Sequence, residues 1–268
     1  MTKKRINRYQ AIIERIFLAH HREGVREFIF ERSEIEQVAK QLRVQLPKNL
    51  GDVIYSARYR SPLPESVIRT APTGHEWVIR AAGRGRYEFS LTTQARITPN
   101  QSLVAVKILD ATPGIIDRYA LQDEQALLAK VRYNRLIDVF SGVVCYSLQN
   151  HLRTTAAGLG QVEIDELYVG VDRHGAQYVF PVQAKTGRDQ INVVQIEQDL
   201  AVCANQFANL VCRPIAAQFM ERNLIALFEL VKTEGRVLVL SERHYRLVSS
   251  DQLSDEELQL YRTTRSTE

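Results

Sequence analysis

Two neighbouring apolar runs decide the fold of this 268-residue chain: EIDELYVGV, residues 163–171, and YVFPVQAK, residues 178–185. Both runs have the β-branched and aromatic content of strands. The intervening DRHG, residues 172–175, has the composition of a tight turn. The sequence therefore predicts a β-hairpin over residues 163–185.

The polar residues of this hairpin are spaced two apart, and residues two apart in a strand share a face. Glu163 and Asp165 should therefore project from one side of the first strand. Gln183 and Lys185 should project from one side of the second. If these faces coincide, carboxylates, an amide oxygen and an ammonium group meet at one point, which is what Mg²⁺-assisted phosphodiester hydrolysis needs. The alternative is an amphipathic hairpin with a solvated charged face.

The segments around the hairpin have a definite order: a helix and a strand precede it, and a helix and a strand follow it. Asp123 is the expected N-cap of the first helix, and Glu124 lies in its first turn, where a carboxylate interacts favourably with the helix dipole. The predicted order is therefore helix, three strands, helix, strand. The ranges of the four flanking elements are 123–137, 143–148, 190–207 and 214–219.

This order, together with Asp165 and the triplet Gln183-Ala184-Lys185, resembles the PD-(D/E)XK nuclease superfamily over residues from about 121 to about 230. The Gln-x-Lys form is similar to that of Mrr-like restriction endonucleases. The resemblance implies an α/β (α+β) fold, with a restriction-endonuclease-like core whose central mixed β-sheet is flanked by helices. It also implies that Asp165 binds Mg²⁺, for which Mn²⁺ is a possible substitute. Gln183 would take the second ligand position, and Lys185 would position or activate the attacking water.

Gln183 departs from the acidic residue that is commoner at this position of the superfamily. A neutral amide lends a metal only its oxygen, so the site has one negative charge fewer. Either another acid supplies that charge or catalysis is lost. We expect Glu163 to be the compensating acid and metal ligand because it shares a face with Asp165; the other reading of Glu163 is a surface residue. Glu124, on the preceding helix, is the alternative acid.

The basic surplus lies wholly in the first third of the chain. Residues 1–96 contain 18 Lys or Arg and 10 Asp or Glu, a net of +8, whereas the remainder holds 17 and 21, a net of −4, which gives the total of +4. Such asymmetry indicates a polyanion-binding module joined to a more neutral one. We expect a DNA-binding domain over residues 1–96, a linker over 97–120 and a nuclease-like domain over 121–268.

The amino-terminal segment predicts helices followed by a hairpin. Ser33 and Glu36 have the spacing of a capping box at the start of one helix. The predicted helices cover residues 12–20, 33–42 and 48–59, and predicted strands over 77–80 and 87–91 flank an Arg-rich tip. This order resembles a winged helix-turn-helix domain, in which the later helix lies in the major groove and the wing contacts the backbone or the minor groove.

Polar and basic side chains follow the presumed recognition helix and the wing. Arg and Asn are able to make bidentate contacts with guanine and adenine edges. We therefore expect both elements to contact DNA; the alternative for any one of these residues is an ordinary solvated side chain. The expected contacts are Lys48, Asn49, Ser56, Arg58 and Arg60 on or beside the helix, and Arg80, Arg84 and Arg86 on the wing.

The global composition is typical of an intracellular enzyme. The sequence contains no run of about 18 apolar residues and no signal-peptide pattern, so we expect a cytoplasmic protein without membrane contact. Cys145, Cys203 and Cys212 lack Cys-x-x-Cys spacing, which favours buried thiols over disulfides or zinc ligands.

These features together predict a Mg²⁺-dependent, sequence-specific endonuclease of double-stranded DNA, either a type II restriction enzyme or a related defence nuclease. A homodimer is expected, because two equivalent active sites most simply cut both strands of a symmetric site. Two alternatives stay open. One is a repair or recombination nuclease that reads DNA structure. The other is a DNA-binding regulator whose nuclease-like domain is inactive, which the neutral Gln183 keeps open.

Overall fold

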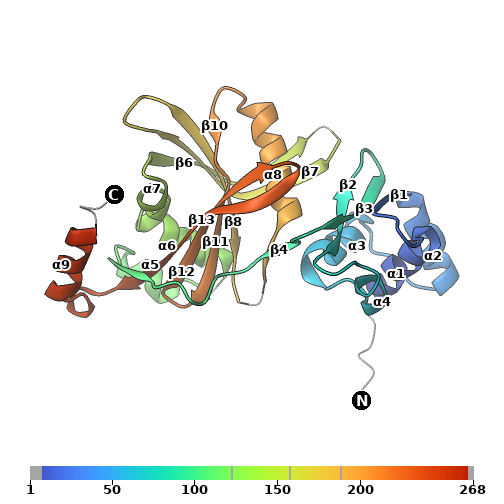
Figure 1. The fold of residues 1–268 in the computed structure, drawn as a ribbon, viewed down its shortest axis with the longest axis horizontal. Helices are drawn as coiled ribbons and strands as arrows, with labels where there is room; N and C mark the ends of the chain where they lie inside the picture. The colour runs from blue at the N-terminus through green and yellow to red at the C-terminus, as the bar shows by residue number, and fades with distance from the viewer. Residues whose placement is uncertain (1–7, 122, 157, 188, 265–268) are drawn as a thin grey trace, which may run out of the picture.

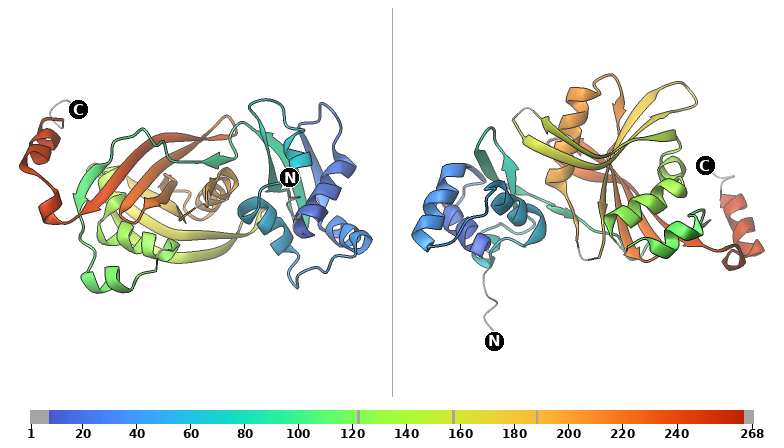
Figure 2. Two further views of the ribbon diagram at one scale, coloured as in Figure 1. Left: turned by 90° about the horizontal axis from the view of Figure 1, so that it is seen from below. Right: turned by 180° about the vertical axis from the view of Figure 1, so that it is seen from behind.

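The computed structural model describes residues 8–121, 123–156, 158–187 and 189–264. The chain folds into two α/β units, with the amino-terminal unit at one end and the carboxyl-terminal helix α9 (Asp255–Thr264) at the other (Figure 1). A curled mixed sheet flanked by helices forms the centre of the second unit (Figures 1 and 2). At this level, the expected mixture of α and β structure around a mixed sheet is confirmed.

The amino-terminal unit packs helices against a small antiparallel sheet. Its elements are α1 (Arg8–His20), β1 (Glu27–Glu31), α2 (Arg32–Leu42), α3 (Gly51–Tyr55), α4 (Glu65–Ile68), β2 (Glu76–Ala81) and β3 (Arg86–Thr92). The strands lie in the order β1-β3-β2. Phe17 of α1 packs against Trp77 and Phe89 at ring-centroid distances of 5.2 and 5.1 Å. Aromatic edge-to-face contacts therefore hold the first helix to the sheet.

The start of α2 differs from the prediction. Glu31 and Glu34 form the capping box, not Ser33 and Glu36. The Glu31 backbone N–H donates to the Glu34 side chain at 2.7 Å. Because β1 runs directly into α2, Glu31 keeps the extended backbone that an N-cap requires, and Ser33 already lies inside the helix.

The predicted helix over residues 48–59 is also shorter at its start. α3 begins at Gly51 and continues into a turn of π-helix over Ser56–Arg60. Asn49 Oδ1 accepts the Gly51 N–H at 3.1 Å, and Asn49 Nδ2 donates to Asp52 at 3.0 Å. Asn49 therefore lies before the helix and satisfies its first free backbone donors.

The second unit is built on one large mixed sheet. Its strands are β5 (Val106–Leu109), β6 (Val144–Ala156), β7 (Gly160–Val171), β8 (Gln177–Lys185), β11 (Ile215–Glu221), β12 (Leu224–Thr233) and β13 (Arg236–Val248), with the short β10 (Val211–Cys212) beside β8. Its helices are α5 (Gly114–Tyr119), α6 (Glu124–Tyr133), α7 (Leu136–Ser141) and α8 (Val193–Gln206). The strand order is β5-β13-β12-β11-β8-β7-β6. The β8–β11, β13–β5 and β10–β8 pairs are parallel, and the other neighbours are antiparallel.

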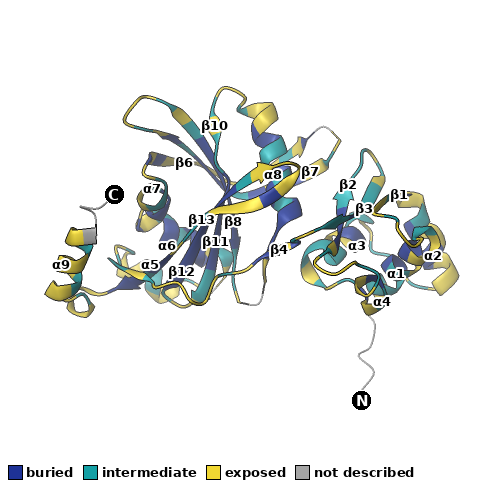
Figure 3. Cartoon of the chain, in the orientation of Figure 1, coloured by how far each residue is buried: buried dark blue, intermediate teal, exposed yellow. Residues whose placement is uncertain are grey.

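Helices cover both faces of this sheet. Leu127 and Val131 of α6 belong to a buried cluster with Phe180 of β8. Val202 of α8 belongs to a separate cluster with Val179 of the same strand. The adjacent residues 179 and 180 thus face opposite helical layers, as alternation along a strand requires. Buried residues follow the central strands between these layers (Figure 3).

The predicted element order before the hairpin is present with longer or divided elements. The helix expected over 123–137 is divided into α6 and α7. Asp123 caps α6 as predicted, and its Oδ1 accepts the Ala126 N–H at 2.9 Å. The strand expected over 143–148 is β6, which extends to Ala156.

The predicted hairpin is formed by β7 and β8. The strands pair antiparallel from Val171 opposite Gln177 to Glu166 opposite Val182, and the ladder ends there. Asp165 and Gln183 are the first residues beyond this point. The end of pairing frees backbone donors and acceptors at the position of the predicted site.

The segment expected to be a linker, residues 97–120, contains regular elements, and one of its strands joins the large sheet. β4 (Arg96–Ile97) pairs with β9 (Ile191–Asn192), β5 lies beside β13 at the sheet edge, and α5 follows. The connection between the two units is therefore structured over much of its length. No helix in the described part of the chain has the length and apolar character needed to cross a membrane.

Candidate functional site

Asp165 lies on β7 immediately after the β7–β8 ladder ends. Its Oδ2 accepts the backbone N–H of Ala184 at 2.8 Å, so a side chain satisfies a donor that strand pairing has left free. The Asp165 side chain is 18% exposed. The carboxylate is therefore fixed against β8 while it keeps access to solvent.

Lys185 brings a cation to the same point. Its Nζ lies 3.9 Å from Asp165 Oδ2 and 3.4 Å from Glu124 Oε1, and it donates to the Ala184 carbonyl at 2.8 Å. The Lys185 side chain is only 13% exposed. An ammonium group in this position stabilises negative charge on Asp165, on Glu124 or on a bound anion.

The pKa of Asp165 is raised above its ordinary value. Burial is the main cause, because it disfavours the charged carboxylate. The positive charge of Lys185 and the hydrogen bond from the Ala184 N–H act in the opposite direction. A cation that bound here would favour the ionised carboxylate further.

The acid nearest to Lys185 is Glu124, not Glu163. Glu124 lies in the first turn of α6, which the Asp123 cap positions, and its side chain is 42% exposed. Glu163 instead turns toward β6, where its Oε1 lies 3.3 Å from Arg153 Nη2 and 3.4 Å from His151 Nδ1. Strand alternation predicts Glu163 beside Asp165, but its side chain instead forms a cross-strand ion pair with Arg153 and lies beside His151. In the described part of the chain, Glu163 makes no hydrogen bond or ion pair with Lys185.

Gln183 is completely buried and is hydrogen-bonded at both ends of its amide. Nε2 donates to both carboxylate oxygens of Asp199, at 3.1 Å each, and to the Glu163 main-chain oxygen at 3.2 Å. Oε1 accepts from Gln195 Nε2 at 3.3 Å. Gln183 is therefore attached to α8, which carries both Gln195 and Asp199.

Asp199 is a residue of this site that the sequence interpretation missed. It is fully buried on α8, and burial raises the pKa of its carboxyl group well above the ordinary value, against the effect of the Gln183 hydrogen bond. The spacing of apolar residues in the sequence could have identified it: Asp199 lies three residues after Ile196 and four before Cys203, both of which are buried. A carboxylate within the apolar stripe of a helix is rare unless it has a partner.

The donors at this strand end fit Mg²⁺ in its usual protein environment. Among the described residues, no group of three or more His, Cys, Asp or Glu could hold a metal. Mg²⁺, however, is bound through one or two carboxylates and retains several waters. Asp165 and Glu124 provide two such carboxylates. Two buried amide oxygens in the described part of the chain also lack a hydrogen-bond partner: Oε1 of Gln195 and Oε1 of Gln218. Gln218 pairs in register with Lys185.

The residues expected to contact DNA are divided between the surface and the interior. Arg58 donates to the Ile79 carbonyl at 2.8 Å, and Arg80 donates to Glu197 of α8 at 2.7 and 2.9 Å. These two arginines are thus engaged at or near the boundary of the units. Lys48, Asn49, Arg60, Arg84 and Arg86 are exposed, and Ser56 is half-buried.

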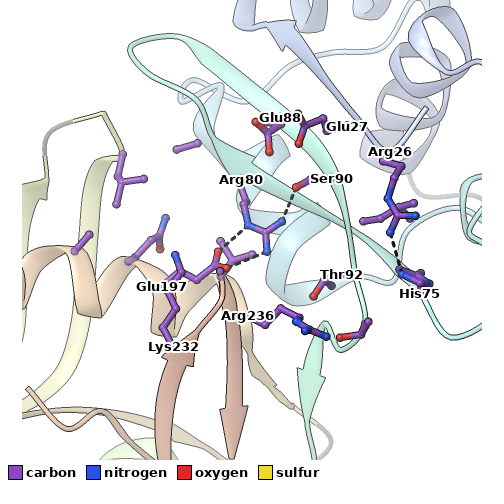
Figure 4. Close-up of a pocket in the computed structure, with 18 residues that line it drawn as sticks. Arg26, Glu27, His75, Arg80, Glu88, Ser90, Thr92, Glu197, Lys232 and Arg236 are labelled. Atoms are coloured by element: carbon purple, nitrogen blue, oxygen red, sulfur yellow. Dashed lines mark hydrogen bonds and ion pairs between the residues drawn. The ribbon is translucent and has the colours of Figure 1, made fainter. Parts of the chain in front are cut away.

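A cleft of about 570 Å³ lies between the two units (Figure 4). The Arg80–Glu197 pair crosses it, Arg26 and His75 line it from the amino-terminal unit, and Arg236 lines it from β13. Neither Asp165 nor Lys185 lines this cleft. α8 separates the cleft from the candidate site, since Glu197 faces the first and Asp199 faces the second.

Further contacts join the units beside this cleft. The Tyr59 hydroxyl donates to Gln198 at 3.3 Å, and Asn192 donates to the Arg58 carbonyl at 3.0 Å. At the tip of the β2–β3 hairpin, the Gly83 N–H donates to the Gly158 carbonyl at 2.9 Å. These polar contacts connect the β2–β3 hairpin and the π-helical turn after α3 to the sheet unit.

When compared with known proteins, the chain matches no family model, no curated protein and no solved structure.

Proposed function

We propose that the protein is a Mg²⁺-dependent endonuclease of double-stranded DNA, of the restriction or defence type, with a winged-helix-like unit that binds DNA and a PD-(D/E)XK-like unit that cleaves it. One observation carries the proposal. Asp165, Lys185 and Glu124 meet where the β7–β8 ladder ends, with distances of 3.9 and 3.4 Å from Lys185 Nζ to the two carboxylates. Two carboxylates beside one half-buried cation are suited to hydrolysing a charged diester.

Each residue has a distinct role in this proposal. Asp165 and Glu124 would hold Mg²⁺, which when bound would neutralise phosphate charge and make a water molecule more acidic. Lys185 would stabilise the negative charge that develops on the phosphate oxygens during attack. Gln183 would lie at the second ligand position with its amide already fixed by hydrogen bonds.

The amino-terminal unit would supply most of the affinity for DNA. Its net charge of +8 over residues 1–96 supports this role. Lys48, Arg60, Arg84 and Arg86 are exposed and are the candidates for direct phosphate or base contacts. Two copies, one acting on each strand, would cleave a symmetric duplex site.

A digest of unmethylated plasmid DNA with and without Mg²⁺ tests this function. Discrete linear fragments that require Mg²⁺ are expected. Nicking only at junctions, flaps or mismatches would favour a repair or recombination nuclease. DNA binding without cleavage would favour a regulator with an inactive nuclease-like unit. The complete burial of Gln183 is compatible with this alternative.

A further inference from the structure

The orientation of the Gln183 amide is determined by its surroundings. Its Nε2 end faces the Asp199 carboxylate and the main-chain oxygen of Glu163. A main-chain carbonyl can only accept, so the nitrogen must lie at this end whatever the charge of Asp199. The amide oxygen is therefore at the opposite end, where Gln195 donates to it and where one lone pair is left.

We propose that Asp199 is a positioning residue for the candidate reaction centre: it holds the Gln183 amide nitrogen, so that the amide oxygen, which among the described residues accepts only from Gln195, is the end left for a bound cation. This inference rests on the proposed function and deepens it. Within the described part of the chain, Asp199 makes no hydrogen bond or ion pair except those from Gln183. A buried carboxylate without a cation lowers stability, so its one partner is the reason it can remain there.

The same contact accounts for a neutral residue at position 183. A glutamate there would set its carboxylate at hydrogen-bond distance from the Asp199 carboxyl group and the Glu163 carbonyl, and the two N–H donors of the amide would be lost. Such a cluster of acceptors is strongly unfavourable in a buried site. Positions 183 and 199 are therefore coupled, and a second acid at 183 is compatible with the fold only if the charge at 199 is removed.

Side-chain NMR of the metal-free protein tests the positioning role without any activity measurement. The Gln183 side-chain NH₂ signal, assigned by its loss in Gln183→Ala, should be protected from hydrogen exchange in the wild-type protein. Asp199→Asn should keep this protection, because the asparagine oxygen can accept from Gln183. Asp199→Leu should lower it by about tenfold or more, since an apolar side chain of similar size offers no acceptor. Asp199→Ala gives the same readout if the leucine variant does not fold.

Calorimetric binding of Mn²⁺ without DNA gives the second readout. The wild-type protein and Asp199→Asn should bind with similar affinity, and Asp199→Leu should bind about tenfold more weakly, an effect typical of losing a residue that orients a ligand. Gln183→Glu should lose stability, and Gln183→Glu with Asp199→Asn should recover it. Equal protection of the Gln183 amide in Asp199→Leu, or equal loss of Mn²⁺ affinity in the asparagine and leucine variants, would overturn the positioning role. Failure of the wild-type protein to bind Mn²⁺ would instead overturn the proposed function, and the metal-free NMR signal distinguishes the two failures.

Discussion

Arg80 of β2 binds Glu197 of α8 through two hydrogen bonds of 2.7 and 2.9 Å, so one guanidinium joins the two units of the molecule. The side chains are 23% and 12% exposed, and a two-bond arginine–carboxylate pair with this burial is stronger than an ordinary surface ion pair. Glu197 lies two residues from Asp199 on the same helix. α8 therefore contacts β2 on one side and the candidate site on the other.

The first prediction concerns this pair. If Arg80 contacts DNA, it must leave Glu197 first, so Glu197→Gln should increase DNA affinity by about tenfold, equivalent to ~1.4 kcal/mol. Fluorescence anisotropy with a short duplex measures the affinity. Glu88→Gln, which removes the same charge from the lining of the same cleft, is the control. An unchanged affinity in Glu197→Gln would mean that Arg80 serves the contact between units and not DNA.

The second prediction concerns the tip of the β2–β3 hairpin, which is the wing of the proposed DNA-binding unit. Arg84 and Arg86 are exposed, so replacing both by Ala should weaken binding to every DNA sequence and reduce the slope of log affinity against log salt by about 0.9 for each lost phosphate contact. Arg173→Ala with Arg222→Ala removes the same charge from the other unit and should leave the slope almost unchanged. Equal slopes for the wing variant and the wild-type protein would show that the tip does not touch DNA.

The third prediction separates the two candidate acids. Glu124 lies 3.4 Å from Lys185, whereas Glu163 is occupied by Arg153 and His151. Glu124→Gln should therefore raise the Mg²⁺ concentration for half-maximal cleavage by about tenfold. Glu163→Gln should raise the Mg²⁺ concentration for half-maximal cleavage by less than about threefold. The reverse ranking in metal titrations of cleavage rate would return the ligand role to Glu163.

The fourth prediction is a dependence of stability on pH. Burial raises the pKa of Asp199, and a group whose pKa is raised by folding stabilises the protein only while it is protonated. That stabilisation is lost as the pH rises through the folded pKa. Asp199→Asn stays neutral, so its Tm should exceed that of the wild-type protein by an amount that grows as the pH rises from the ordinary pKa range of a carboxyl group toward the raised pKa of Asp199. Thermal unfolding followed by circular dichroism measures this.

The matched control for this experiment is Asp255→Asn on the exposed first turn of α9. Its Tm should follow that of the wild-type protein at each pH. A Tm difference for Asp199→Asn that stays constant or shrinks as the pH rises would contradict the raised pKa.

The sequence predicted the hairpin and its flanking elements because buried strands and amphipathic helices have a clear period. The Asp123 cap and the approach of Lys185 to Asp165 follow from that reasoning. The true surroundings of Glu163 did not, because its partners Arg153 and His151 lie in the second half of β6. The sequence of that half, NHLRTTA over residues 150–156, is mostly polar, so hydrophobic periodicity does not mark it as a strand.

Contacts between segments that are distant in the sequence could not be predicted from it either. Gln183 and Asp199 are separated by 16 residues and meet only because α8 packs across β8. The net charge of the first 96 residues indicates a polyanion partner, but it does not predict that Arg80 is turned toward Glu197. Charge composition reports the total over a surface, while the direction of one side chain depends on how the units pack.

The most direct test of the account is the single-turnover rate of Mg²⁺-dependent plasmid cleavage by Lys185→Ala beside the wild-type protein and Lys232→Ala, which removes an exposed lysine outside the candidate site. Lys185→Ala should lower the rate by at least about 100-fold, because it removes the cation that stabilises the reacting phosphate, while its DNA affinity stays within about threefold. Lys232→Ala should cleave at the wild-type rate. Cleavage by Lys185→Ala at the wild-type rate would contradict the assignment of this strand end as the active site.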